Sequence, residues 1–152
     1  MKSNRNANRT PETVVVEDEN RELHCLNGPA RISRWWNGNL CYVEYFVHGV
    51  RHRDDGPAEL HHREDGSLIA EIYIADGLRH RVDGPAHTIY NPDGTVCTLE
   101  YYEAGNLHRT DGPACQSSAG RVEWFIEGVK LEGLALVNYL SNNNLAFLKT
   151  EL

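Results

Sequence analysis

A three-residue motif recurs along this chain at a constant spacing. Gly-Pro-Ala begins at Gly28, Gly56, Gly84 and Gly112, and each copy starts 28 residues after the one before it. Two further glycines accompany each copy, so the repeat accounts for twelve of the thirteen glycines and four of the six prolines. A fixed period of this kind indicates a repeat architecture, in which each unit buries its apolar surface against its neighbours. The sequence therefore predicts four stacked copies of one structural unit.

Each unit has the pattern of a β-hairpin. A short strand follows Gly-Pro-Ala, and in the first three units Asn-Gly or Asp-Gly then marks a tight turn. A longer strand rich in Val, Ile, Tyr and Phe comes next. The longer strands are predicted at Leu40–Val47, Leu68–Ala75 and Val96–Glu103. One aromatic position per unit should form a column across the sheet, which contains Tyr45, Tyr73, Tyr101 and Trp124.

The segments outside the repeats are predicted to be a tail and two caps. Residues 1–12 are polar and predict a disordered N-terminal tail. Val14–Val16 lie 28 residues before part of the second strand, which predicts a half-unit closing the first edge. Residues 131–152 predict a helical C-terminal cap, because one helical stripe contains Leu134, Leu136, Val137 and Leu140.

The predicted fold class is mainly β, a single-domain antiparallel β-meander that forms an open repeat sheet of about four hairpin units. The sheet should extend over residues 13–130. The predicted units lie near residues 24–50, 51–77, 79–105 and 107–128.

Composition restricts the possible functions. The chain has 152 residues, enough for one domain, and its formal net charge of −7 argues against general electrostatic attraction to nucleic acid or anionic lipid. Its apolar runs all fall short of the roughly 20 residues that a membrane-spanning helix needs. The segment Met1–Thr10 is polar, which does not fit a signal peptide. We therefore expect a cytoplasmic protein that neither binds nucleic acid directly nor resides in a membrane.

A charged loop precedes three of the four Gly-Pro-Ala copies. It has the pattern His-Arg-x-Asp, whereas the first copy keeps only His24 and replaces the Asp with Asn27. His, Arg and Asp together are suited to acid–base catalysis or to phosphate binding. Because a catalytic site needs one such set and this set recurs, we interpret it as structural. The residues concerned are His52, Arg53, Asp55, His80, Arg81, Asp83, His108, Arg109 and Asp111.

The sequence predicts no metal, cofactor, disulfide or catalytic residue. Successive repeat histidines should lie roughly 10 Å apart, as two strand spacings, which is too far for one metal ion to bridge. Cys41 and Cys97 occupy the same position two units apart, and the chain has no CxxC motif. We therefore expect reduced thiols. The chain also lacks a phosphate-binding glycine loop, a nucleophile elbow and a zinc motif.

These repeats resemble a known family. A hairpin unit with periodic glycines and an aromatic second strand is similar to the MORN repeat, and the variant with His-Arg-x-Asp-Gly-Pro-Ala resembles MORN-like repeats of uncharacterised bacteriophage, giant-virus and bacterial proteins. The resemblance covers about Glu22 to Lys130. MORN units are shorter and lack the Arg-Asp-Gly-Pro loop, which weakens any transfer of function. The resemblance implies a curved antiparallel meander used for binding, without catalysis.

We therefore expect a non-enzymatic protein-binding module. One specific version, given the phage-like resemblance, is a phage-encoded inhibitor that binds and blocks a host defence complex in the host cytoplasm. Alternatives are a lipid-surface binding repeat protein, a structural protein that self-associates through an open sheet edge, and an enzyme or metal protein built on the repeated loops. The predicted partner-binding residues are aromatic anchors and acidic rim residues. They are Trp35, Trp36, Tyr42, Glu44, Tyr73 and Glu100.

Overall fold

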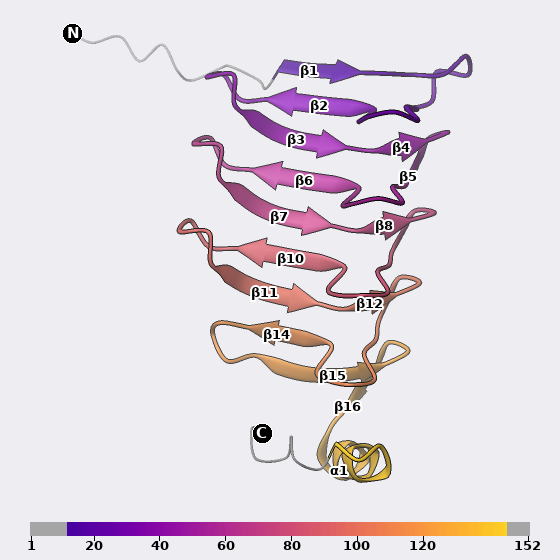
Figure 1. Ribbon diagram of the computed structural model, residues 1–152, viewed down its shortest axis with the longest axis vertical. Helices are drawn as coiled ribbons and strands as arrows, with labels where there is room; N and C mark the ends of the chain where they lie inside the picture. Colours follow the sequence, from indigo (N-terminus) through magenta and orange to yellow (C-terminus); the bar gives the residue numbers. More distant parts are fainter. Residues whose placement is uncertain (1–11, 146–152) are drawn as a thin grey trace, which may run out of the picture.

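Ten strands form one antiparallel sheet in which each strand lies beside the next long strand of the chain (Figure 1). This computed structural model describes residues 12–145. The first strands of the four units are β2 (Arg31–Arg34), β6 (Glu59–His62), β10 (His87–Tyr90) and β14 (Cys115–Ser117). The second strands are β3 (Leu40–Glu44), β7 (Leu68–Ile72), β11 (Val96–Glu100) and β15 (Val122–Ile126). The predicted mainly β, antiparallel repeat sheet is therefore confirmed.

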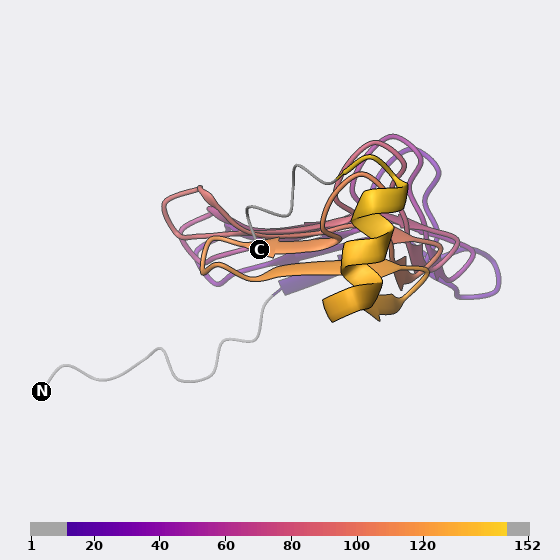
Figure 2. The same cartoon turned by 90° about the horizontal axis from the view of Figure 1, so that it is seen from below.

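Small hairpins continue from the second strands and gather with their loops at one end of the sheet (Figure 2). They are β4 (Phe46–Val47) with β5 (Val50–Arg51), β8 (Ile74–Ala75) with β9 (Leu78–Arg79), and β12 (Tyr102–Glu103) with β13 (Asn106–Leu107). In the fourth unit the corresponding partner of β15 is β16 (Val129–Leu131), which joins the large sheet.

The predicted long second strands are interrupted at one tyrosine per unit. The N–H of Tyr45 donates to the carbonyl of Ala58 in the large sheet, whereas its own carbonyl accepts from His52 in the small hairpin. Tyr73 makes the same two bonds with Ala86 and His80, and Tyr101 makes them with Ala114 and His108. The sequence missed this break because the apolar pattern continues through it. Only β15 runs uninterrupted past the aromatic position.

Two different turns use the two recurring turn glycines. At the first turn only the glycine has a positive φ, as at Gly66 (89°). In the first three units the residue before this glycine accepts a backbone N–H in an Asx-turn, with Asp65 Oδ1 2.8 Å from Ser67 N. At the second turn both residues are left-handed, for example Asp76 at 49° and Gly77 at 80°. That pattern is typical of a two-residue type I′ hairpin turn.

The predicted half-unit at the first edge is present, but its register differs by one residue. β1 (Glu12–Val15) pairs with β2, and Val14 lies opposite Ile32. Leu60 is the repeat equivalent of Ile32, and in the next unit it lies opposite Val43. Val14 therefore takes the place that Val43 has one unit later. The offset is therefore 29 residues instead of 28, and a one-residue shift moves every side chain to the opposite face. The predicted tail lies outside the described residues, except Glu12, which begins β1.

A single helix follows the last strand, as predicted for the C-terminal cap. α1 (Gly133–Asn142) buries Leu140 completely, but Leu134 in the predicted stripe is 74 % exposed. The helix therefore contacts the sheet near its C-terminal end, not along the whole stripe. The rest of the predicted cap, residues 146–152, lies outside the described residues. Within residues 12–145 no helix has the length and hydropathy to cross a membrane.

Candidate functional site

The repeated histidines hold the second turn of their own unit. In each unit the Nδ1 atom accepts the N–H of the left-handed turn residue 19 or 24 positions later, at distances of 3.0–3.2 Å. The pairs are His24 with His48, His52 with Asp76, His80 with Ala104, and His108 with Glu127. A nitrogen that accepts an N–H carries no proton, so the neutral ring keeps its hydrogen on Nε2. Each imidazole thus stabilises a turn residue that sits in a sparsely populated backbone region.

The repeated arginines stack on the column of tyrosines. The guanidinium carbons of Arg53, Arg81 and Arg109 lie 4.0, 3.9 and 4.1 Å from the ring centroids of Tyr45, Tyr73 and Tyr101. Each guanidinium also donates to the proline carbonyl of its own loop, at 3.2–3.5 Å. Cation–π stacking within about 6 Å of a ring centroid is attractive.

The acidic residue and the glycine of the loop complete this arrangement. Arg53 and Arg109 donate to Asp55 and Asp111 at 2.7 Å. A Cβ placed on Gly112 would lie 2.8 Å from the guanidinium carbon of Arg109, so a larger residue here would have to displace the guanidinium from its stacked position. Three of the four loops therefore contain the same stack of tyrosine ring, guanidinium and glycine.

In the last unit the helix α1 takes the place of the loop arginine that stacks on the aromatic residue in the earlier units. Trp124, the final aromatic residue of the column, is buried, and the ring of Tyr139 in α1 lies 6.3 Å from it. The Tyr139 hydroxyl donates to the carbonyl of Thr110 at 3.0 Å. α1 thus covers the end of the column that has no following loop to cover it.

The opposite face of the sheet contains ion pairs. Glu44 is only 5 % exposed and accepts from Arg31 at 2.7 Å and from Arg51 at 2.9 Å; Arg51 also contacts Glu59. Burial raises the pKa of the Glu44 carboxyl, but the hydrogen bonds from Arg31 and Arg51 outweigh it and hold the pKa below its usual value. Glu44 is therefore not the exposed rim residue that the sequence predicted.

Glu100, at the same repeat position two units later, has a similar environment. Its carboxylate lies 2.9 Å from His87 Nδ1 and accepts from the Tyr102 hydroxyl at 3.3 Å. The hydrogen bond with His87 lowers the pKa of the Glu100 carboxyl, against the opposing effect of burial. Both predicted rim acids thus belong to internal networks on one face.

The predicted aromatic anchors do not form one surface. Tyr42 is on the ion-pair face, 44 % exposed, with its ring edge-on to His61 at 4.8 Å. Tyr73 lies on the other face beneath Arg81. Trp35 donates from Nε1 to the carbonyl of His62 in the next unit at 3.1 Å, as Arg63 does to Tyr90 at 2.6 Å. Of this set, Trp36 and Tyr42 are the members with large exposed rings.

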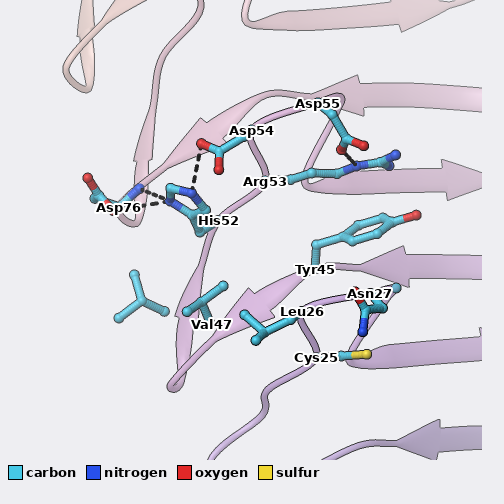
Figure 3. A pocket seen from close by; sticks show the side chains of 12 residues that line it. Cys25, Leu26, Asn27, Tyr45, Val47, His52, Arg53, Asp54, Asp55 and Asp76 are labelled. Carbon is cyan, nitrogen blue, oxygen red and sulfur yellow. Dashed lines mark hydrogen bonds and ion pairs between the residues drawn. The ribbon is translucent and has the colours of Figure 1, made fainter.

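A groove lies between the first two repeated loops (Figure 3). It has a volume of about 990 Å³, whereas the equivalent groove between the third and fourth loops has about 480 Å³. Figure 3 shows His52 between the carboxylates of Asp54 and Asp76, and Arg53 next to Asp55. Leu26 and Val47 lie on the other side of the groove. The sequence predicted that these loops stack, but not the groove between them, because its width depends on how the side chains of the two loops pack.

Three potential metal ligands meet beside the first unit. Donor atoms of Asp18, His24 and His48 all lie within 4.8 Å of one another, and the two imidazoles stack with centroids 4.2 Å apart. Asp18 Oδ2 lies 2.9 Å from His48 Nδ1, and this hydrogen bond lowers the pKa of the Asp18 carboxyl. The repeat period did not reveal this group, since Asp18 lies outside the four units.

The hydrogen bonding of this cluster does not favour metal binding. The Nδ1 lone pair of His24 accepts the N–H of His48, so the neutral ring presents an N–H, not a lone pair, at Nε2. Asp18 Oδ1 already accepts two backbone N–H groups, from Asn20 and Glu22. The cluster is a hydrogen-bonded support for the second turn of the first unit.

All four cysteines are free thiols. Burial raises the pKa of Cys41 and also that of Cys115, so neither is activated as a thiolate.

Comparison with models of known protein families and with curated protein sequences gives no match for this chain.

Proposed function

We propose that this protein is a non-catalytic module that binds another protein. The observation that carries the proposal is the internal use of the repeated polar side chains. The four histidines at the repeat position each accept a backbone N–H, and the three arginines of the repeated loops each stack on a tyrosine. Catalytic acids and bases have to meet a substrate at one place. Residues that recur and hold turns instead favour a scaffold whose exposed surface carries the function.

A more specific version is a phage-encoded inhibitor that binds and blocks a host defence complex. It rests on the resemblance of the His-Arg-x-Asp-Gly-Pro-Ala units to MORN-like repeats of bacteriophage, giant-virus and bacterial proteins. The net charge of −7 supports this version, because a protein surface that normally holds nucleic acid is positively charged. In the same way, the acidic balance does not favour binding to anionic lipid.

The test is to mix the full-length protein with a panel of purified host defence nuclease complexes and to follow both size-exclusion migration and nuclease activity. We expect comigration with one complex and a matching loss of its activity. The complex should persist at moderate salt if shape and apolar contacts contribute besides charge. Separate migration and unchanged activity across the panel would count against the inhibitor version.

Self-association is the second candidate, and one observation favours it. β1 forms the edge of the sheet in the described part of the chain, and Val14, Val15 and Val16 are exposed along it. An exposed edge strand of apolar residues is a template for pairing with another strand. Sedimentation of a concentration series would reveal a dimer, and Val14→Lys on that edge should abolish it. A monomer at all concentrations would remove this candidate.

A further inference from the structure

The groove between the first two loops departs from the repeat on both of its sides. On one side the consensus Arg-x-Asp is replaced by Cys25, Leu26 and Asn27, and Leu26 is 76 % exposed. Leu26 holds the variable position of the loop, where the third loop also has an exposed apolar residue, Val82, at 82 %. The first loop differs because Cys25 and Asn27 also replace the charged Arg and Asp of the consensus. This side of the groove is therefore apolar and carries no charged side chain.

The other side of the same groove is the most acidic version of the loop. Asp54 precedes the consensus Asp55, where the later loops have Val82 and Thr110, and the turn residue is Asp76 where the next unit has Ala104. The Asp54 and Asp76 side chains are 93 % and 92 % exposed. Asp55 is balanced by Arg53 at 2.7 Å, so the carboxylates of Asp54 and Asp76 give the groove a negative charge.

His52 lies between these two carboxylates. Its Nδ1 is 3.1 Å from both the N–H and the Oδ1 of Asp76, and its Nε2 lies 3.1 Å from Asp54 Oδ1. One imidazole carries at most one positive charge against two carboxylates, so this wall stays negative in either form of the ring. The groove thus combines an apolar wall, formed by Leu26, Val47 and Val50, with a wall of net negative charge.

We propose that this groove is the partner-binding site and that it takes an extended peptide segment in which leucine-like side chains alternate with arginine or lysine. The apolar side chains would lie against Leu26, Val47 and Val50, and the cations would meet Asp54 and Asp76. Charge complementarity selects the cationic class, because like charges placed against this wall would be repelled. This inference rests on the proposed protein-binding function and names the chemistry of the partner.

Two peptides of matched length test it against the full-length protein by isothermal titration calorimetry. The probe is acetyl-Leu-Arg-Leu-Arg-amide, and the charge-reversed control is acetyl-Leu-Glu-Leu-Glu-amide. We expect saturable binding of the probe, with affinity that falls as salt rises, and no binding of the control. Absence of probe binding, or equal binding of both peptides, would overturn the proposal.

Variants locate the site. Leu26→Asp should weaken probe binding by about tenfold or more, since it removes apolar area; Asp54→Asn with Asp76→Asn should weaken it roughly fivefold and flatten its salt dependence. Val82→Asp is the matched control, because Val82 occupies the equivalent loop position two units later and is 82 % exposed. Equal losses for Leu26→Asp and Val82→Asp would overturn the assignment to this groove.

The two proposals can fail separately. A host complex that comigrates equally with wild type and with Leu26→Asp would leave the protein-binding function intact and refute the groove. Loss of comigration with Leu26→Asp, but not with Val82→Asp, would support both. Circular dichroism of each variant confirms that the sheet is unchanged.

Discussion

The guanidinium of Arg81 lies 3.9 Å from the centre of the Tyr73 ring, and the same relationship recurs one unit earlier and one unit later. Tyr73 stands where the second strand leaves the large sheet, and Arg81 belongs to the loop that returns the chain to it. The contact between the arginine and the tyrosine therefore holds the loop after each small hairpin against the end of the second strand. It also gives the charged residue that recurs in the loop a structural role.

A double-mutant cycle on this pair should give a favourable coupling energy. We expect Arg81→Ala and Tyr73→Leu each to lower the free energy of unfolding, with about 0.5–2 kcal/mol of coupling between them. Urea denaturation of the wild type, both single variants and the double variant measures it. Strictly additive losses would show that the stack contributes no stability.

Gly112→Ala should destabilise the protein because of crowding. The new Cβ would lie 2.8 Å from the Arg109 guanidinium carbon, and overpacking of this kind costs about 1–3 kcal/mol. The loss should shrink when Gly112→Ala is made in an Arg109→Ala background, where the obstacle is gone. An equal loss in both backgrounds would point to the backbone instead.

His80→Ala should lower stability by about 1–2 kcal/mol. The substitution removes the acceptor for the N–H of Ala104, which is held at a φ of 46° and 3.2 Å from His80 Nδ1. Thermal unfolding followed by circular dichroism gives the change. An unaltered melting temperature would contradict the structural role of the repeated histidines and would favour the view that they act on a ligand.

Leu140→Ala should cost about 2–4 kcal/mol, because the side chain is fully buried at the contact of the helix with the last unit. Leu134→Ala, on the same helix but 74 % exposed, is the control and should change stability by less than about 0.5 kcal/mol. Similar effects of the two substitutions in urea denaturation would mean that α1 is not packed as a cap.

Acid should destabilise the protein partly through Glu100. His87 lowers the pKa of this carboxyl in the folded state, so its stabilising contribution is complete above the ordinary glutamate pKa of about 4.3 and is lost as pH falls through the lowered value. Glu100→Gln should reduce stability at neutral pH and flatten the decline below about pH 5. Urea denaturation between pH 7 and 3 checks this, with the exposed Glu19→Gln as control. An unchanged acid profile in Glu100→Gln would refute the contribution.

Much of the fold could be predicted from the sequence, because the same local pattern occurs four times and each copy supports the same prediction. The period of Gly28, Gly56, Gly84 and Gly112 was enough to predict stacked hairpins, since identical local sequences favour identical turns. The structure nevertheless corrected several details. β1 is displaced by one residue, because pairing with Ile32 is decided by the sheet and not by the period. The break at Tyr45 was also not visible in the sequence, since a strand pattern does not show which residue donates its N–H to the Tyr45 carbonyl.

The sequence by itself determined the period, the turn chemistry and the order of the strands, because these depend on local backbone preferences and side-chain alternation. Only the tertiary structure decided which side chains meet across units. Trp35 and Tyr73 were predicted to share a binding surface, yet Trp35 donates to the strand β6 of the next unit and Tyr73 lies beneath an arginine. The groove between Leu26 and Asp54 exists only because stacking places two loops, 28 residues apart in the chain, side by side. Contacts between distant segments depend on the summed packing of the whole sheet, which no local pattern encodes.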